Sequence, residues 1–158
     1  MSACETALSK AKVLHVDECE AFFVERKVIT VRITDSEIAE IKQNQERSLA
    51  VRLIHQKRIG SAKTSKLDEI NKAVEDALKS TSLVKPKNYW KSLPSITKFL
   101  SLEKLYDQKL ADISGAQASD ISQSMINSAM HQKVTTISGS INIVFEKIQI
   151  AKIGRAHV

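Results

Sequence analysis

Histidines are the side chains of this sequence whose spacing decides most directly whether it can bind a metal. A hydrolytic zinc site needs two histidines one helical turn apart with a carboxylate beside them, so that both imidazoles reach one ion and the acid activates its water. His15, His55 and His131 each stand alone. We interpret each as a surface or strand-end residue and expect no metal ligand among them.

The two cysteines, Cys4 and Cys19, are the other candidate metal ligands. They form no CxxC pair, and no histidine lies beside them at ligand spacing. Residues 1–12 contain an acid and alternating polar residues instead of the apolar core of a secretory signal. We therefore predict two buried, reduced thiols and no disulfide.

Patterns for other kinds of catalysis are missing from the sequence. It contains no GxSxG elbow, and its glycines stand too far apart to form a phosphate-binding loop. Two pairs of acids have a spacing to consider, Glu18 with Glu20 and Glu37 with Glu40. Both pairs fall in strand or turn contexts, so we interpret them as solvated. We expect no catalytic and no cofactor-binding residue in this chain.

The composition is that of one globular domain. The chain has 158 residues, of which 42% are hydrophobic and 27% charged. No apolar run approaches the roughly 20 residues that span a bilayer. We therefore expect a cytoplasmic protein without a membrane contact.

The net charge of +6 raises the question of a nucleic-acid partner. The lysines are dispersed and mostly interleaved with acids, which favours a solvated basic surface over a binding site. Tyr89 and Trp90 lie near lysines and could stack on bases. We favour the interpretation that they anchor their own loop or contact another domain, and expect no nucleic-acid partner.

The clearest secondary-structure pattern lies in residues 49–65. Residues 49–54 alternate with the two-residue period of a half-buried strand, and the polar residues 56–58 predict a tight turn. A second strand follows over residues 59–62. Gly60 within it indicates a bulge or the close approach of another backbone, since glycine otherwise weakens a strand.

A helix is predicted directly after this hairpin, over residues 67–80. Thr64 or Ser65 could cap it, and acids follow in its first turn.

The remaining predictions before residue 49 are a helix over 2–14, strands over 18–25 and 28–34 with a turn at Arg26–Lys27, a turn at Asp35–Ser36 and a strand over 37–42. Those after residue 80 are an irregular Pro-containing stretch, a short amphipathic turn including Leu102 and Leu110, a helix over 118–131, and a hairpin over 134–150 that turns at Gly139–Ser140.

Helix, strand meander and helix together predict an α+β fold, with an antiparallel or mixed sheet covered on one face by two helices. We divide the chain into an α+β N-terminal domain over 1–82, a linker over 83–100, and a helix with a strand hairpin over 101–151 that begins the next part of a longer protein.

The hairpin and the helix after it also carry a family resemblance. The sequence resembles the N-terminal domain of TldD/PmbA proteins, once labelled modulators of DNA gyrase and now regarded as metalloprotease subunits. The matching positions, which we interpret as structural, are Val51, Arg52, Gly60, Ser61, Ala62, Thr64 and Leu67.

The resemblance implies a peptidase subunit that pairs as a homodimer or heterodimer and processes unfolded peptides. In the TldD type zinc is bound by an HExxxH-like motif later in the chain, whereas the PmbA (TldE) type lacks it. This chain carries no such motif, so the resemblance implies zinc only in a missing C-terminal part, and only if the protein is of the TldD type. The present chain would then act as a scaffold and contribute to the dimer contact. The alternative interpretation is a basic α+β module that binds nucleic acid or another protein.

The last residues, 152–158, have a different origin in our interpretation. Residues 153–158, back-translated as ATC GGA AGA GCA CAC GTC, resemble a widely used short-read sequencing adapter, whose next codon in that frame is TGA. We therefore interpret the segment as an artefact and expect a truncated reading frame.

This interpretation predicts that the frame of the source DNA continues past the codon for Ala151. Amplifying and sequencing the downstream DNA tests it. A continuation with a His-Glu-containing helix motif indicates the zinc-binding type, and one without it indicates the metal-free type. A stop codon directly after Val158 would contradict the truncation.

Overall fold

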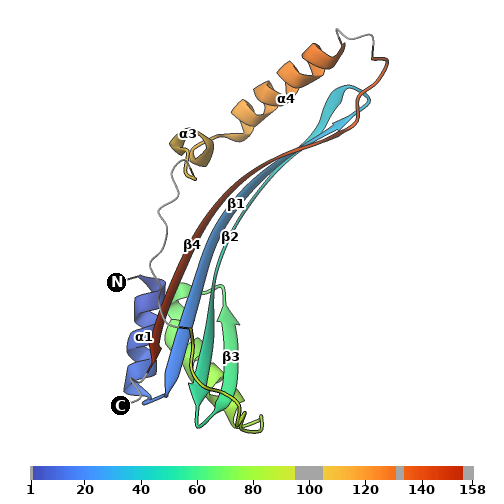
Figure 1. The fold of residues 1–158 in the computed structure, drawn as a ribbon. Helices are drawn as coiled ribbons and strands as arrows, with labels where there is room; N and C mark the ends of the chain where they lie inside the picture. Colours follow the sequence, from blue (N-terminus) through green and yellow to red (C-terminus); the bar gives the residue numbers. More distant parts are fainter. Residues whose placement is uncertain (1, 95–104, 131–133, 155–158) are drawn as a thin grey trace. The chain divides into compact units, whose positions relative to one another are not determined.

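The computed structural model describes residues 2–94, 105–130 and 134–154. In chain order its elements are α1 (Ala3–Val13), β1 (Glu18–Thr34), β2 (Glu37–His55), β3 (Arg58–Thr64), a 3-10 turn (Leu67–Glu69), α2 (Ile70–Thr81), α3 (Gln108–Ala111), α4 (Gly115–Met130) and β4 (Gly139–Gly154). One sheet has the strand order β3-β2-β1-β4 (Figure 1). The predicted α+β fold class is confirmed.

The chain divides into two compact units, which are described separately. Unit 1 contains residues 1–25, 47–98 and 147–158, and unit 2 contains residues 26–46 and 99–146. The long strands β1, β2 and β4 contribute residues to both. None of the helices in the described parts of either unit is long and apolar enough to cross a membrane.

The core of unit 1 lies between one face of the sheet and the two helices α1 and α2. Every second residue of β1 and β2 is buried on that face, as the period of a strand requires. The buried residues are Cys19, Ala21 and Phe23 of β1, Leu49, Val51 and Leu53 of β2, Cys4, Ala7 and Ala11 of α1, and Ile70, Val74 and Ala77 of α2. The predicted sheet with two helices on one face is therefore confirmed.

Local interactions fix where α1 begins and how it sits beside α2. The hydroxyl of Ser2 accepts a hydrogen bond from the Glu5 backbone at 3.2 Å, and the Ser2 backbone donates to the Glu5 carboxylate at 2.7 Å, which forms a capping box. Lys10 of α1 lies 2.6 Å from Glu75 of α2. The hydrogen bond from Lys10, together with its charge, lowers the pKa of Glu75.

The predicted hairpin of residues 49–65 is present as the end of β2 followed by β3. Gln56 and Lys57 form the turn with φ angles of 51° and 60°, the left-handed pair that matches the twist of two antiparallel strands. The register runs without interruption from Leu49 opposite Thr64 to His55 opposite Arg58. The regular register shows that Gly60 does not form a bulge.

Gly60 instead marks the close approach of another backbone, the second of the two predicted possibilities. A Cβ atom at this position would lie 2.2 Å from the carbonyl oxygen of Ala77 and 2.7 Å from Cγ2 of Thr81, both in α2. The Ser61 backbone also donates to the hydroxyl of Ser80 at 3.0 Å. Only a residue without a side chain lets α2 pack this closely on β3.

The predicted cap of the next helix is wrong. Thr64 bonds to the backbone of Lys66 within a local turn, at 3.0 Å to its nitrogen and 3.2 Å to its oxygen. The chain then forms the 3-10 turn, and α2 begins at Ile70 without a side-chain cap. Because Thr64 is still paired in β3, opposite Leu49, it lies too early in the chain to cap α2.

In unit 2, the predicted turn at Arg26–Lys27 is also wrong, because β1 continues through both residues. Lys27 donates to the carbonyl oxygens of Ala111 at 3.3 Å and Ile113 at 2.9 Å, and Arg26 lies 3.9 Å from Glu146. Each cation therefore has a partner within its own unit, so the polar pair does not end the strand. The chain turns at Asp35–Ser36, as predicted.

The core of unit 2 is a small apolar cluster. It joins Ile29 and Val31 of β1 to Ile113 and to Ala118 of α4. Ile38, Ile141 and Ile143 pack partly buried against it. The predicted helix over 118–131 is present as α4. The predictions for residues 95–104, including Leu102, for His131 and for residues 155–158 lie outside the described residues.

The predicted hairpin over 134–150 is wrong as well. The Ser36 backbone donates to the carbonyl of Ile137 at 2.8 Å, and the Ile137 backbone donates to the Ser36 hydroxyl at 3.0 Å. This segment therefore binds the β1–β2 turn instead of forming a strand. Residues 139–154 form the single strand β4, whose neighbour is β1. The strand thus includes residues 152–154.

The contact at Gly60 yields a stability prediction. Gly60→Ala is expected to lower the free energy of unfolding by about 3 kcal/mol, because its Cβ would force α2 away from β3. Urea unfolding followed by circular dichroism measures the change. Gly139→Ala is the matched control, since no atom lies within 4 Å of a Cβ built there. Equal effects of the two substitutions would contradict the close-packing argument.

Candidate functional site

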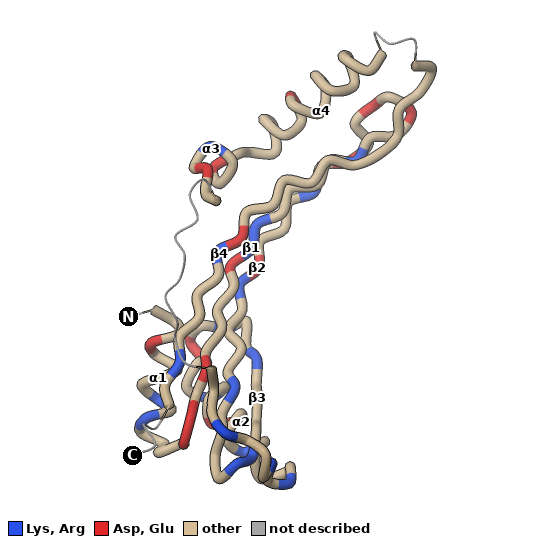
Figure 2. The backbone as a smooth tube through the Cα atoms, viewed as in Figure 1, with Lys and Arg blue, Asp and Glu red and all other residues tan. Residues whose placement is uncertain are grey.

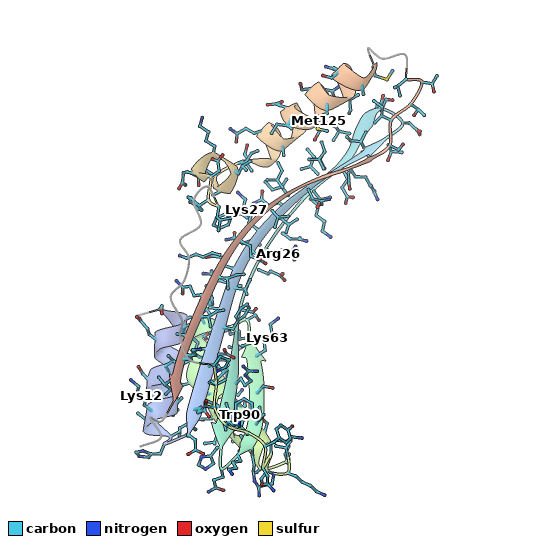
Figure 3. All side chains as sticks on the ribbon, viewed as in Figure 1. Lys12, Arg26, Lys27, Lys63, Trp90 and Met125 are labelled. Atoms are coloured by element: carbon cyan, nitrogen blue, oxygen red, sulfur yellow. The ribbon has the colours of Figure 1, made fainter. Side chains whose placement is uncertain are left out.

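A hollow of about 270 Å³ lies in unit 1, at the end of the sheet where β1 begins and β2 turns into β3. Its lining residues come from the start of β1, from the β2–β3 turn and from the segment after α2. They are Asp17, Glu18, Ile54, Gln56, Lys57, Trp90 and Lys91. Ile54 and Glu18 alternate with core residues of their strands, so the hollow lies on the face of the sheet opposite α1 and α2. Figure 3 shows Trp90 at this end of the sheet.

Glu18 holds one side of this hollow together. Its side chain is 4% exposed, and its carboxylate accepts hydrogen bonds from the indole nitrogen of Trp90 at 2.9 Å and from the Leu93 backbone. The interpretation of Glu18 as solvated is therefore wrong. A buried carboxylate is stable here because two N–H donors replace its water.

The segment 83–94 passes the β2–β3 turn at the end of the sheet and is attached at several points. The Lys87 backbone donates to the carbonyl of Lys57 at 2.7 Å, Leu93 is buried, and Lys152 of β4 donates to the carbonyl of Pro94. Trp90 is thus anchored in its own unit, as predicted. Tyr89 is not, because 76% of its side chain is exposed.

Beyond the hollow, the same open face carries an ion pair and an apolar stripe. Arg52 lies 2.5 Å from the carboxylate of Glu20. Phe22, Ile148 and Ile150 are large apolar residues exposed on this face. Gly154 lies against Glu18, so the antiparallel alignment brings Ile150 beside Phe22.

The remaining family positions have structural surroundings. Val51 is buried in the core, and it faces Ala62 across the β2–β3 pair. Ala62 and Leu67 are half-buried against the core of unit 1. The positions that the resemblance singles out therefore build and close the helix-covered sheet.

None of the described histidines and cysteines is among the residues that line this hollow. His15 follows α1 in a turn, and His55 ends β2. Cys4 and Cys19 are free thiols buried in the core, as predicted, and burial, with a smaller effect of the Glu20 charge, raises the pKa of Cys19 to about 12. No group of three His, Cys, Asp or Glu residues that could hold a metal occurs among residues 2–94, 105–130 and 134–154.

The groups that line the hollow are apolar, acidic and basic. Trp90 and Ile54 supply apolar walls, and Lys57 and Lys91 supply positive charge at the rim. The local sequence gives no direct sign that Glu18 is buried or that Lys57 and Lys91 line the same hollow. The one available signal was an acid at the first position of a strand together with the single tryptophan of the chain.

The architecture is that of an α+β domain in which two helices cover one face of an antiparallel sheet. Three solved structures share it. TldE from Thermococcus kodakarensis matches 96% of this chain with a TM-score of 0.81 and 22% identity. Two proteins that carry the name modulator of DNA gyrase match 95% of it, each at 16% identity: one from Thermotoga maritima, with a TM-score of 0.65, and one from Bacteroides thetaiotaomicron, with 0.69.

Residues 19–81 match the family described as PmbA/TldA metallopeptidase domain 1. This match confirms, over residues 19–81, the resemblance to the N-terminal domain of TldD/PmbA proteins that the sequence shows. No curated protein matches the chain. The chain spans about a third of the length of the solved structures, namely 35%, 33% and 38% of those chains.

The buried carboxylate gives a prediction about the hollow. Glu18→Ala leaves the indole and the Leu93 backbone without an acceptor, so we expect a loss of about 2 kcal/mol in the free energy of unfolding. The emission of Trp90, the only tryptophan, is expected to shift to the red as the segment 83–94 detaches. Steady-state fluorescence with acrylamide quenching measures this. Exposed Glu37→Ala is the control, and an unchanged Trp90 spectrum in Glu18→Ala would refute the role of Glu18.

Proposed function

We propose that this chain is the N-terminal, non-catalytic part of a TldD/PmbA-type metallopeptidase subunit that processes unfolded peptides in the cytoplasm. The observation that carries the proposal is the match of residues 19–81 to the first domain of that family. Zinc, where the parent subunit binds it, belongs in this proposal to a part outside the present chain. The role of this part is to act as scaffold and to contribute to a homodimeric or heterodimeric contact.

The exposed stripe on the open sheet face supports the contact role. Phe22, Ile148 and Ile150 lie on one face of unit 1, and Ile150 has 61% of its side chain exposed. Apolar residues that gather on a sheet face gain free energy when a partner covers them. Among the described residues β4 is also an edge strand of the sheet, and an edge strand can pair with another chain.

Self-association tests the contact. We expect the chain to form dimers in sedimentation velocity across a concentration series, and Ile150→Lys to shift it toward the monomer because a charge would have to be buried in the contact. Val13→Lys is the control, since Val13 is 71% exposed but lies at the end of α1, away from the stripe. An equal shift in both variants, or a monomeric parent chain, would speak against a contact at this face.

Activity tests the non-catalytic assignment. We expect the chain to leave an unstructured peptide intact with or without added zinc, as judged by mass spectrometry. Hydrolysis that depends on zinc and stops with a chelator would overturn the assignment.

A further inference from the structure

Positive charge in unit 1 is concentrated in two stretches of the sequence. Residues 47–67 contain six Lys and Arg residues and no acid, and residues 77–94 contain four lysines and no acid. The interpretation of the lysines as interleaved with acids does not hold for these two stretches, which the mixed charges of α2 separate in the sequence. Figure 2 shows Lys and Arg gathered around the β2–β3 turn and the segment that follows α2.

The fold joins the two stretches. The hydrogen bond of 2.7 Å from the Lys87 backbone to the Lys57 carbonyl holds the segment after α2 against the β2–β3 turn. Lys57 and Lys91 line the same hollow. The basic patch, as we define it, consists of Lys57, Lys85, Lys87 and Lys91 with the exposed ring of Tyr89 between the last two.

The positive charges of the patch are not neutralised by ion pairs among the described residues. None of its four lysines is in an ion pair with an acid among the described residues. Two acids also line the hollow, and backbone donors hold both: Leu93 donates to Glu18, and Gln56 donates to Asp17 at 2.6 Å. The four lysines of the patch outnumber these two carboxylates, and an excess of positive charge attracts a polyanion.

The patch is also held in place before any ligand arrives. Trp90, between Tyr89 and Lys91, is fixed by its hydrogen bond to Glu18, and Pro86 restricts the backbone between Lys85 and Lys87. A preformed surface loses less conformational entropy on binding. The anchored tryptophan thus presents its neighbours Tyr89 and Lys91 outward.

We propose that the basic patch binds single-stranded nucleic acid, with the four lysines facing phosphates and Tyr89 stacking on a base. Proteins that bind single-stranded nucleic acid combine cationic side chains with exposed aromatic rings. The rings stack on the flat faces of the bases, and the cations face the charged phosphates. An acidic peptide would use the lysines but would gain nothing specific from the ring. This inference is independent of the peptidase proposal.

The test measures the affinity of the full chain for a fluorescein-labelled oligothymidylate about 15 nucleotides long, by fluorescence anisotropy at several salt concentrations. With four phosphates neutralised at about 0.7 each, the plot of log affinity against log salt is expected to have a slope of about −2.8. Lys87→Gln combined with Lys91→Gln should make the slope shallower by about 1.4. Tyr89→Ala should weaken binding about tenfold at every salt concentration with an unchanged slope, and Tyr89→Phe should bind like the parent.

The control removes the same charge elsewhere in unit 1. Lys12→Gln combined with Lys72→Gln alters exposed lysines of α1 and α2, on the helix side of the sheet, and should leave the slope and affinity near those of the parent. Circular dichroism checks that each variant is folded. Three results would overturn the proposal: no binding at low salt, equal losses in the control and patch variants, or competition by a polyglutamate peptide as strong as by unlabelled oligothymidylate with no effect of Tyr89→Ala.

Discussion

The arrangement of unit 1 depends on how closely α2 can approach β3. At Gly60 the backbones are so near that a Cβ atom would lie 2.2 Å from a carbonyl oxygen of α2. Small residues also occupy the rest of the core of unit 1, where Ala7, Ala11, Ala21 and Ala77 are fully buried. Because α2 lies this close to the strand, the chain that leaves it at Thr81 can reach the β2–β3 turn and continue onto the opposite face of the sheet.

Much of this fold could be predicted from the sequence where the pattern was local. The alternation in residues 49–54, the polar turn after it and the isolated glycine gave the hairpin and the close approach, because strand period and glycine sterics act within a few residues. The ends and partners of strands could not be predicted in the same way. Arg26–Lys27 looked like a turn because its partners, Ala111 and Ile113, are distant in sequence. Residues 134–138 alternate like a strand, but the β1–β2 turn takes up their hydrogen bonds.

The hollow was predictable only in part for the same reason. That Trp90 would be anchored followed from its place in a Pro-containing loop, but its acceptor Glu18 lies 72 residues earlier. A carboxylate at the start of a strand gives no local sign that two donors will bury it. The basic patch was hidden likewise, since the lysines of two acid-free stretches become neighbours only when the segment 83–94 lies on the turn. Family positions such as Val51 and Arg52, by contrast, needed no such distant information.

The strand order β3-β2-β1-β4 has a consequence for how the chain assembles. The neighbours β1, β2 and β3 follow one another directly, so their pairing requires only short loops to close. β4 reaches β1 from far along the sequence, as the bond between Thr30 and Asn142 across 112 residues shows. Closing so long a loop is slow relative to hairpin formation. During synthesis, the edge of β1 that pairs with β4 therefore remains open until β4 emerges from the ribosome, and an open strand edge favours aggregation.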